Sequence, residues 1–236
     1  MKRVLLLSGK INSGKNQLAE YLTEGFDKIG LSTRSDLFAK PLKDGCREDF
    51  ARLATVLQEM TDSLRTFFKA SHDNGMTDYQ ERAILRFDTL LEEFLIRDEN
   101  WYEQKTPITR AILQIYGTEI FRRRVQDDWW VDKMAERVRE NSADVTVVTD
   151  ARYPNEVDGL KHKLESEPEF EVIAIRIDRD IKSADSVATH SSEIALDDYK
   201  GWSYRIDNNG TLDELKAAAQ ALIENITAGV RESEAA

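Results

Sequence analysis

Residues 9–15 have the types and spacing of a phosphate-binding loop. The stretch reads GKINSGK, which matches G-x-x-x-x-G-K, and it follows the apolar run 4–7. Glycines let a backbone curl until successive N–H groups point at phosphate oxygens. A lysine at the end of the loop supplies a mobile positive charge for the outermost phosphates. The pattern therefore predicts that phosphates are bound by Gly9, Lys10, Asn12, Ser13, Gly14, Lys15 and Asn16.

The residue after the loop lysine departs from the usual pattern. A Ser or Thr hydroxyl normally binds Mg²⁺ there, whereas this chain has Asn16. An amide oxygen is also a ligand for a hard cation, directly or through water. Asp150 ends the apolar stretch 145–149, where a P-loop protein places a second carboxylate that organises the metal. We therefore predict Asn16 and Asp150 as metal ligands. The alternative for Asp150 is an N-cap of the helix that begins near Pro154.

Two arginines follow predicted strands closely enough to reach a phosphate. Arg152 lies two residues after Asp150, and its planar fork suits a phosphate group, although a surface pair with Glu156 is an equal alternative. Arg179 follows the apolar stretch 171–178 and begins a polar, irregular segment. An arginine that enters from a lid would stabilise the charge of a moving phosphoryl group.

Alternating strand and helix patterns set the expected architecture. Strands are predicted at 4–7, 30–38, 145–149, 171–178 and 204–206, with helical patterns between them. This alternation predicts an α/β fold with a five-stranded parallel sheet wrapped by helices. Ligands of such sheets bind at the carboxyl ends of the strands. The segments that fall on this edge are 9–16, 36–43, 150–156, 179 onward and 208–211.

About a hundred residues of predicted helix separate the second strand from the third. Pro41 is placed at the first turn of a helix, and apolar spacing continues the helical pattern from Leu53 to Phe68. Residues 71–77 are predicted as a loop, and a further helix spans 84–98. Thr106 starts a helix that continues to Phe121, and another surrounds Trp130. The last helix begins with a capping box of Thr211 and Glu214.

Composition excludes several classes of protein. The chain has 236 residues, of which 41% are hydrophobic, and a net charge of −11. The negative charge argues against extended contact with a nucleic-acid backbone. No apolar run reaches the length of a membrane span, and the first apolar stretch is too short for a signal peptide. Cys46 is the single cysteine, so we expect no disulfide framework and a reducing cytoplasm.

Several motifs together resemble one family, the deoxynucleoside monophosphate kinases of tailed bacteriophages. In chain order these motifs are GKINSGK, FAKPLK at 38–43, ILQIYGTEIFR at 112–122, DDWWVDKM at 127–134, TDARYPNE at 149–156, IDRD at 177–180 with HSSE at 190–193, and NNGTLDEL at 208–215. They cover most of the chain outside 44–105, a segment in which we match no motif.

The resemblance implies an adenylate-kinase-like fold and phosphoryl transfer from ATP to deoxynucleoside 5′-monophosphates with Mg²⁺. It implies one P-loop kinase domain over 1–236, with a helical insertion at 44–141 that covers the monophosphate and a lid at 179–200. Donor contacts would extend to Asn208, Gly210 and Thr211 near the adenine. The implied catalytic residues are Lys15, Asp150, Arg152 and Arg179. Monophosphate contacts would come from Asp36, Phe38, Lys43, Arg110, Gln114, Asp128, Trp129, Asp150 and Arg152.

Two rival functions stay open on the sequence. A P-loop kinase of another small acceptor, such as dephospho-coenzyme A, would share the loop and the Asn-Gly-Thr-Leu ending. A nucleotide-binding protein that transfers no phosphate would share the loop alone. At the level of the family, a homodimer is possible and the host-cell cytoplasm is the expected location.

Overall fold

The computed structural model describes residues 1–71, 77–78, 81–82, 85–86, 103, 106–180 and 194–233. The chain divides into two compact units. Unit 1 comprises Met1–Lys40 and Gln126–Ala236, and unit 2 comprises Pro41–Val125. Most of the predicted loop at 71–77, most of the predicted helix at 84–98 and the HSSE motif lie outside the described residues.

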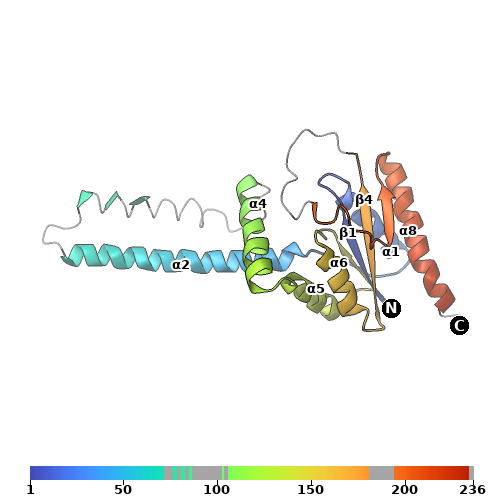
Figure 1. Ribbon diagram of the computed structural model, residues 1–236, viewed down its shortest axis with the longest axis horizontal. Helices are drawn as coiled ribbons and strands as arrows, with labels where there is room; N and C mark the ends of the chain where they lie inside the picture. Colours follow the sequence, from blue (N-terminus) through green and yellow to red (C-terminus); the bar gives the residue numbers. More distant parts are fainter. Residues whose placement is uncertain are drawn as a thin grey trace. The chain divides into compact units, whose positions relative to one another are not determined.

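Unit 1 is built on a parallel sheet (Figure 1). The strand order is β2-β3-β1-β4-β5, and every neighbouring pair is parallel. This arrangement confirms the predicted α/β fold with a five-stranded parallel sheet, the fold of a P-loop kinase. The strands are β1 (Lys2–Ser8), β2 (Thr33–Asp36), β3 (Val145–Val148), β4 (Phe170–Asp178) and β5 (Tyr204–Asp207).

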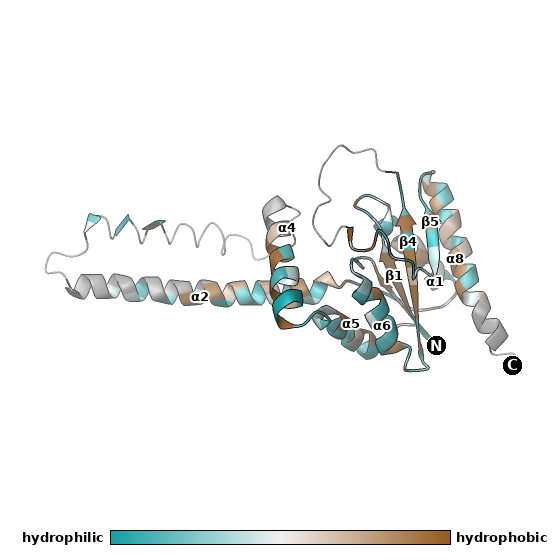
Figure 2. Ribbon diagram, viewed as in Figure 1, coloured by the Kyte–Doolittle hydropathy of each residue, from teal (hydrophilic) through white to brown (hydrophobic). Residues whose placement is uncertain are grey.

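One face of the sheet packs on α1 (Lys15–Lys28) and α8 (Leu212–Ser233). Helix α1 buries Leu18, Leu22 and Phe26, whose four-residue spacing places them on one side of the helix. The strands contribute every second residue to this core, as the pleat requires. Figure 2 shows the apolar strands β1 and β4 inside unit 1. The strand side chains in this core are Leu5, Leu7, Val145, Val147, Ile173, Ile175, Ile177 and Ile206.

The other face is covered by α5 (Trp129–Glu140) and α6 (Pro154–Leu164) (Figure 1). Helix α5 buries Trp130, so this tryptophan is a core residue. The two helices are joined by an ion pair of 2.8 Å between Lys163 Nζ and Asp132 Oδ1. Both faces of the sheet are therefore covered, which explains why β1, β3 and β4 are buried along nearly their whole length.

Helix α2 (Ala39–Ser71) begins in unit 1 and continues into unit 2. Pro41 lies in its first turn, as predicted, because the missing N–H of proline costs nothing there. The two predicted helical patterns around Pro41 and at 53–68 form this single helix. Helix α4 (Pro107–Gln114) starts where predicted, with Thr106 Oγ1 accepting a hydrogen bond from the Thr109 N–H at 3.1 Å.

The prediction of one α-helix from Thr106 to Phe121 is wrong in its second half. From Ile115 to Val125 the chain forms a π-helix, in which each hydrogen bond spans one more residue than in an α-helix. Tyr116, Gly117, Thr118 and Arg122 are buried in it. Over so few turns, the apolar spacing of the sequence does not separate the two helical periods.

None of the helices in the described part of the chain combines the length and the apolar character of a membrane span.

Candidate active site

The predicted phosphate-binding loop connects β1 to α1 and is tightly curled. Gly14 has φ +97°, and a Cβ on it would lie 2.3 Å from Nδ2 of Asn208. A Cβ on Gly9 would lie 2.5 Å from the carbonyl oxygen of Ile177. Asn12, between the two glycines, also has a positive φ of 62°. Both ends of the loop therefore require glycine because neighbouring atoms approach the backbone closely.

The groups around this loop are suited to an anion. Gly14 caps α1 without a side-chain hydrogen bond, and the first turn of α1 carries no acidic residue, which favours anion binding at the helix N-terminus. The ammonium group of Lys15 donates to the carbonyls of Gly9 and Lys10, each at 2.7 Å. Ser13 is buried, and its hydroxyl has no hydrogen-bond partner within the described structure. The loop thus combines a cation, a helix N-terminus and a spare hydroxyl.

Asn208 links the loop to the end of β4. Its Nδ2 donates to the Ser13 carbonyl at 2.8 Å, and its backbone N–H donates to the Asp178 carbonyl at 2.8 Å. Only 6% of Asn208 is exposed. The structure thereby assigns its side chain to bracing the loop, a role that the predicted contact with adenine did not anticipate.

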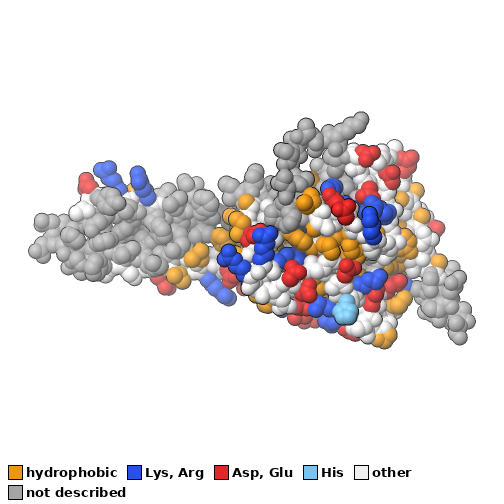
Figure 3. Space-filling view, in the orientation of Figure 1, with side chains coloured by type: hydrophobic (Ala, Val, Ile, Leu, Met, Phe, Trp, Pro, Cys, Tyr) orange, Lys and Arg blue, Asp and Glu red, His pale blue; other side chains and the backbone are white. Residues whose placement is uncertain are grey.

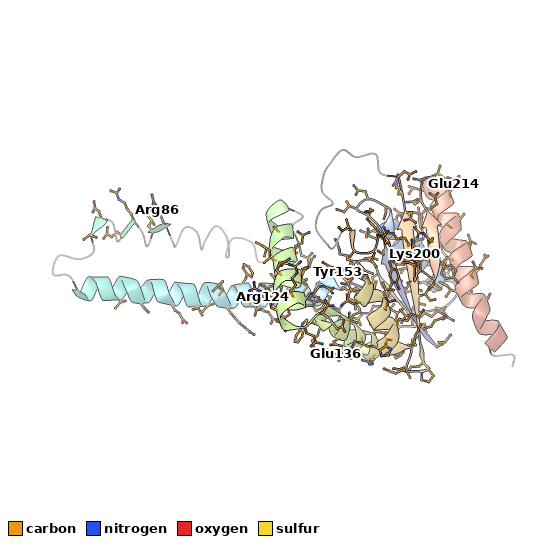
Figure 4. The ribbon with its side chains drawn as sticks, in the orientation of Figure 1. Arg86, Arg124, Glu136, Tyr153, Lys200 and Glu214 are labelled. Carbon is orange, nitrogen blue, oxygen red and sulfur yellow. The ribbon has the colours of Figure 1, made fainter. Side chains whose placement is uncertain are left out.

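Gly210 and Thr211 are exposed beside Asn208 at the start of α8. The predicted capping box is confirmed, because the Glu214 N–H donates to Thr211 Oγ1 at 3.2 Å while Glu214 Oε2 accepts from the Thr211 N–H at 2.6 Å. Hydrogen bonds from the Thr211 backbone, and then from its hydroxyl, lower the pKa of Glu214. Figure 4 shows Glu214 at this end of α8.

Asp150 lies after β3 and holds the start of α2. Its Oδ1 accepts from the Phe38 N–H at 2.8 Å, and its Oδ2 accepts from the Ala39 N–H at 2.9 Å. Burial raises the pKa of this carboxyl, and the two backbone N–H groups and the charge of Arg152 only partly offset that increase. Both oxygens of the predicted metal ligand are therefore engaged by backbone donors.

The N-terminus of α6 is capped by Glu156 and not by Asp150, the alternative that the sequence offered for that aspartate. Glu156, which is buried, accepts from the Arg152 N–H at 2.6 Å and from the Tyr153 N–H at 3.1 Å. Tyr153 marks this helix start in Figure 4. Arg152 and Arg179 are both exposed, which leaves their side chains accessible to a ligand.

Asp36, at the end of β2, is a buried structural carboxylate. It accepts hydrogen bonds from the Leu37 N–H at 2.7 Å and from the Arg137 guanidinium. Burial is the first cause that lowers the pKa of Arg137, and the positive charge of Arg34 is the second. Only 4% of Asp36 and 4% of Phe38 is exposed. Both residues therefore support the predicted site from the protein interior.

The other predicted acceptor contacts are divided between the units. In unit 1, Asp128 accepts from Asn155 Nδ2 at 3.0 Å, and the Lys133 ammonium lies 5.5 Å from the ring centre of Trp129. Lys43, Arg110 and Gln114 belong to unit 2. Lys43 pairs with Glu103 at 2.5 Å, and Gln114 ends α4. Arg110 lies in α4, and its side chain is outside the described part of the structure.

Among the described residues, no group of three or more His, Cys, Asp or Glu side chains could hold a metal ion. Mg²⁺ in nucleotide sites commonly needs fewer protein ligands, because substrate phosphates and water complete its shell. Asn16 is exposed directly after Lys15, so its amide oxygen fits this use. The roles of Asn16 and Asp150 toward Mg²⁺ stay predictions.

Charges of both signs are interspersed over the part of unit 1 that Figure 3 shows. The residues that the structure brings together at the carboxyl edge of the sheet include two that the site prediction omitted. Arg176, in β4, and Asp197 both pair beside the loop. A single acidic residue in an irregular stretch carries no sequence signal, so the sequence did not predict a role for Asp197.

The sequence model of the family described as deoxynucleotide monophosphate kinase matches residues 49–219. This match covers more than two thirds of the chain. The chain belongs to the deoxynucleotide monophosphate kinase family. The matched range starts after the phosphate-binding loop. The loop is therefore an observation separate from the family match, and it is consistent with a kinase. It also includes most of 44–105, where the sequence motifs gave no match.

A protein of Acanthamoeba polyphaga mimivirus is a full-length relative of this kinase. It is named "Putative deoxynucleotide monophosphate kinase" and is 27% identical over 222 residues. The aligned region covers 93% of this chain and 95% of the mimivirus protein. The similarity therefore extends over parts of both units.

Proposed function

We propose that this kinase transfers the γ-phosphoryl group of ATP to deoxynucleoside 5′-monophosphates and releases ADP and deoxynucleoside diphosphates. The family match over residues 49–219 is the observation that carries the proposal. The glycine loop between β1 and α1 supplies the element that such a reaction needs for its donor. The name of the mimivirus relative points to the same class of reaction.

The donor phosphates would lie in the loop at 9–16. Lys15 already contacts two loop carbonyls there, and its flexible stem allows the ammonium group to turn toward phosphate oxygens. The N–H groups at the start of α1 would bind the same oxygens. These contacts fix the donor in one orientation and spread positive charge around the group that moves.

The acceptor needs no strong general base. An oxygen of the monophosphate is already anionic, so it forms the new P–O bond while the bond between the γ-phosphorus and the β,γ-bridging oxygen breaks. Its negative charge opposes that of the donor. Lys15, Arg152 and Arg179 would offset this repulsion, and Mg²⁺, when bound, supplies further charge neutralisation on the donor phosphates. Asn16 would hold the metal.

Deoxynucleotide acceptance is tested by a coupled assay that follows ADP formation from ATP and Mg²⁺. Each of dGMP, dTMP, dCMP and dAMP is offered separately, and the diphosphate product is identified by chromatography. We expect turnover with at least one of the four and loss of turnover when EDTA removes Mg²⁺. Dephospho-coenzyme A, as a fifth acceptor, tests the rival small-molecule kinase.

Lys15→Ala is the control that ties turnover to the loop. We expect its rate to fall by about three orders of magnitude, since Lys15 provides transition-state charge stabilisation, while its circular dichroism spectrum stays that of the wild type. A rate equal to the wild type would contradict the assignment of the loop. ATP binding without turnover of any acceptor would favour the non-catalytic nucleotide-binding protein.

A further inference from the structure

Asp197 joins a cation of the phosphate-binding loop to a cation of β4. Its Oδ2 is 2.5 Å from the ammonium nitrogen of Lys10, the second residue of the loop. Its Oδ1 is 3.3 Å from a guanidinium nitrogen of Arg176. All three residues belong to unit 1. One carboxylate thus bridges a loop residue and a strand residue.

Arg176 is a rigid end of this bridge. Only 7% of it is exposed, and it lies in β4 in register with Ser8, the residue just before the loop. Its guanidinium donates to Ser8 Oγ and to Asp178, each at 3.3 Å, and it lies 5.8 Å from the ring centre of Trp202. Buried arginines require such pairing, and the several contacts together restrict its rotation.

The backbone around Asp197 is anchored independently of that carboxylate. The preceding residue, Leu196, is 3% exposed. Two residues further on, the Tyr199 hydroxyl donates to Asp158 in α6 at 2.5 Å, and the Tyr199 ring packs edge-on against Trp202. Asp197 is therefore held by its own neighbours as well as by Arg176.

Lys10 is the flexible end of the bridge. Its carbonyl accepts from Lys15 Nζ at 2.7 Å and from the Ser13 N–H at 3.2 Å, so its backbone is part of the loop. Its side chain has a long stem with considerable rotamer entropy. The bond to Asp197 limits that freedom and holds the ammonium group beside the loop.

We propose that Asp197 is a positioning residue of the donor-phosphate site, which fixes the ammonium group of Lys10 beside the loop by means of its second bond to buried Arg176. The proposal rests on the proposed function only in taking the loop as the site of the donor phosphates. A fixed ammonium group binds phosphate with a smaller loss of side-chain entropy than a free one.

A simple electrostatic role for Asp197 has the opposite consequence. Together with Asp178, it faces three cations, namely Lys10, Arg176 and Arg205. Removal of one carboxylate would leave this group more positive, and on charge alone an anionic ligand would bind more tightly. Positioning predicts weaker binding. The sign of the change therefore separates the two roles.

Binding of ATP·Mg²⁺ to the full chain, measured by calorimetry, is the test. We expect Asp197→Asn to raise the Kd by about twofold to fivefold, the upper scale of partly exposed ion pairs, with Asp197→Glu recovering part of the loss. Asp198→Asn is the matched control, because this adjacent acid is exposed, and we expect it to leave the Kd unchanged.

A double-mutant cycle with Lys10→Met shows whether the effect passes through Lys10. We expect Asp197→Asn to add little to the loss caused by Lys10→Met alone. Circular dichroism and thermal melts establish whether each variant is folded. If Asp197→Asn unfolds, Lys10→Met still tests the bridge, because it removes only the bond to Lys10 and keeps the bond between Asp197 and buried Arg176.

Tighter or unchanged binding in folded Asp197→Asn, or fully additive losses in the cycle, would overturn the proposal. Wild-type protein that binds no ATP would overturn it together with the proposed function. Wild-type protein that binds ATP but phosphorylates no acceptor would remove the proposed function alone, since the binding cycle requires no acceptor.

Discussion

Single residues of the phosphate-binding loop are constrained by close contacts as well as by backbone conformation. Gly14 and Gly30 both have positive φ values, of 97° and 84°. A Cβ on Gly14 would collide with Asn208, whereas nothing lies within 4 Å of the corresponding position on Gly30. An alanine at Gly30 therefore meets only the free-energy cost of the left-handed backbone, whereas an alanine at Gly14 also meets the cost of the collision with Asn208.

We expect Gly30→Ala to lower the free energy of unfolding by about 1 to 2 kcal/mol, the cost of a left-handed alanine, and to leave the KM for ATP unchanged. Gly14→Ala should cost more and should also raise that KM, because it displaces the Asn208 brace. Urea titrations and steady-state kinetics measure the two effects. Equal losses of stability with an unchanged KM in both variants would contradict the brace.

At the scale of elements, helix starts explain several charged residues at the carboxyl edge of the sheet. Asp150 holds the first turn of α2, Glu156 caps α6, and Glu214 caps α8. Each carboxylate meets backbone N–H groups that the helix leaves without partners. Acidic residues that resemble catalytic groups in the sequence thus also organise the elements around the site.

The cap of α8 predicts a dependence of stability on pH. The folded-state pKa of Glu214 lies below its ordinary value of 4.5, so its contribution is fully present above that value and is lost as the pH falls through the folded pKa. We expect Glu214→Gln to melt at a lower temperature than the wild type at pH 7, with the difference shrinking below about pH 4.5.

Asp213→Asn is the matched control for this cap, because Asp213 lies in the same first turn of α8, whereas it is the Glu214 side chain that accepts the hydrogen bonds from Thr211. We expect its melting temperature to differ from that of the wild type by less than the Glu214 variant at pH 7. A constant difference between wild type and Glu214→Gln from pH 7 to pH 3.5 would contradict a role for the ionised carboxylate.

At the scale of the whole molecule, the single cysteine reports on unit 2. Cys46 is fully buried in α2, within unit 2. Burial, and to a smaller extent the negative charge of Asp49, raise the pKa of its thiol to about 12. Little of the reactive thiolate therefore forms at neutral pH, and burial also keeps reagents in the solvent away from the sulfur.

We expect Cys46 to react with a disulfide reagent at pH 8 about a thousandfold more slowly in the native protein than in urea, since burial raises the pKa of its thiol to about 12 and the thiolate is the reactive form. Thr55→Cys adds an exposed thiol on the same helix and should react quickly beside the slow one. Two equally fast thiols in native buffer would show that unit 2 opens readily.

Sequence patterns determined the features that depend on neighbours along the chain. They include the five strands, the glycine loop, the proline in the first turn of α2 and the capping box of α8, because apolar period, turn residues and caps act over a few residues. The prediction of phosphate binding at the loop followed from the same local patterns. The possible homodimer stays a prediction, and the sequence did not determine which bases are accepted.

Only the tertiary structure decided which distant groups meet. Asp150 bonds to Phe38, 112 residues away, and Asp197 bonds to Lys10, 187 residues away. Such pairs depend on the order of the strands in the sheet, and the period of a sequence does not encode this order. The π-helix from Ile115 to Val125, in which Tyr116 and Arg122 are buried, likewise did not follow from the apolar spacing. Local patterns specified the elements, and packing between elements specified the site.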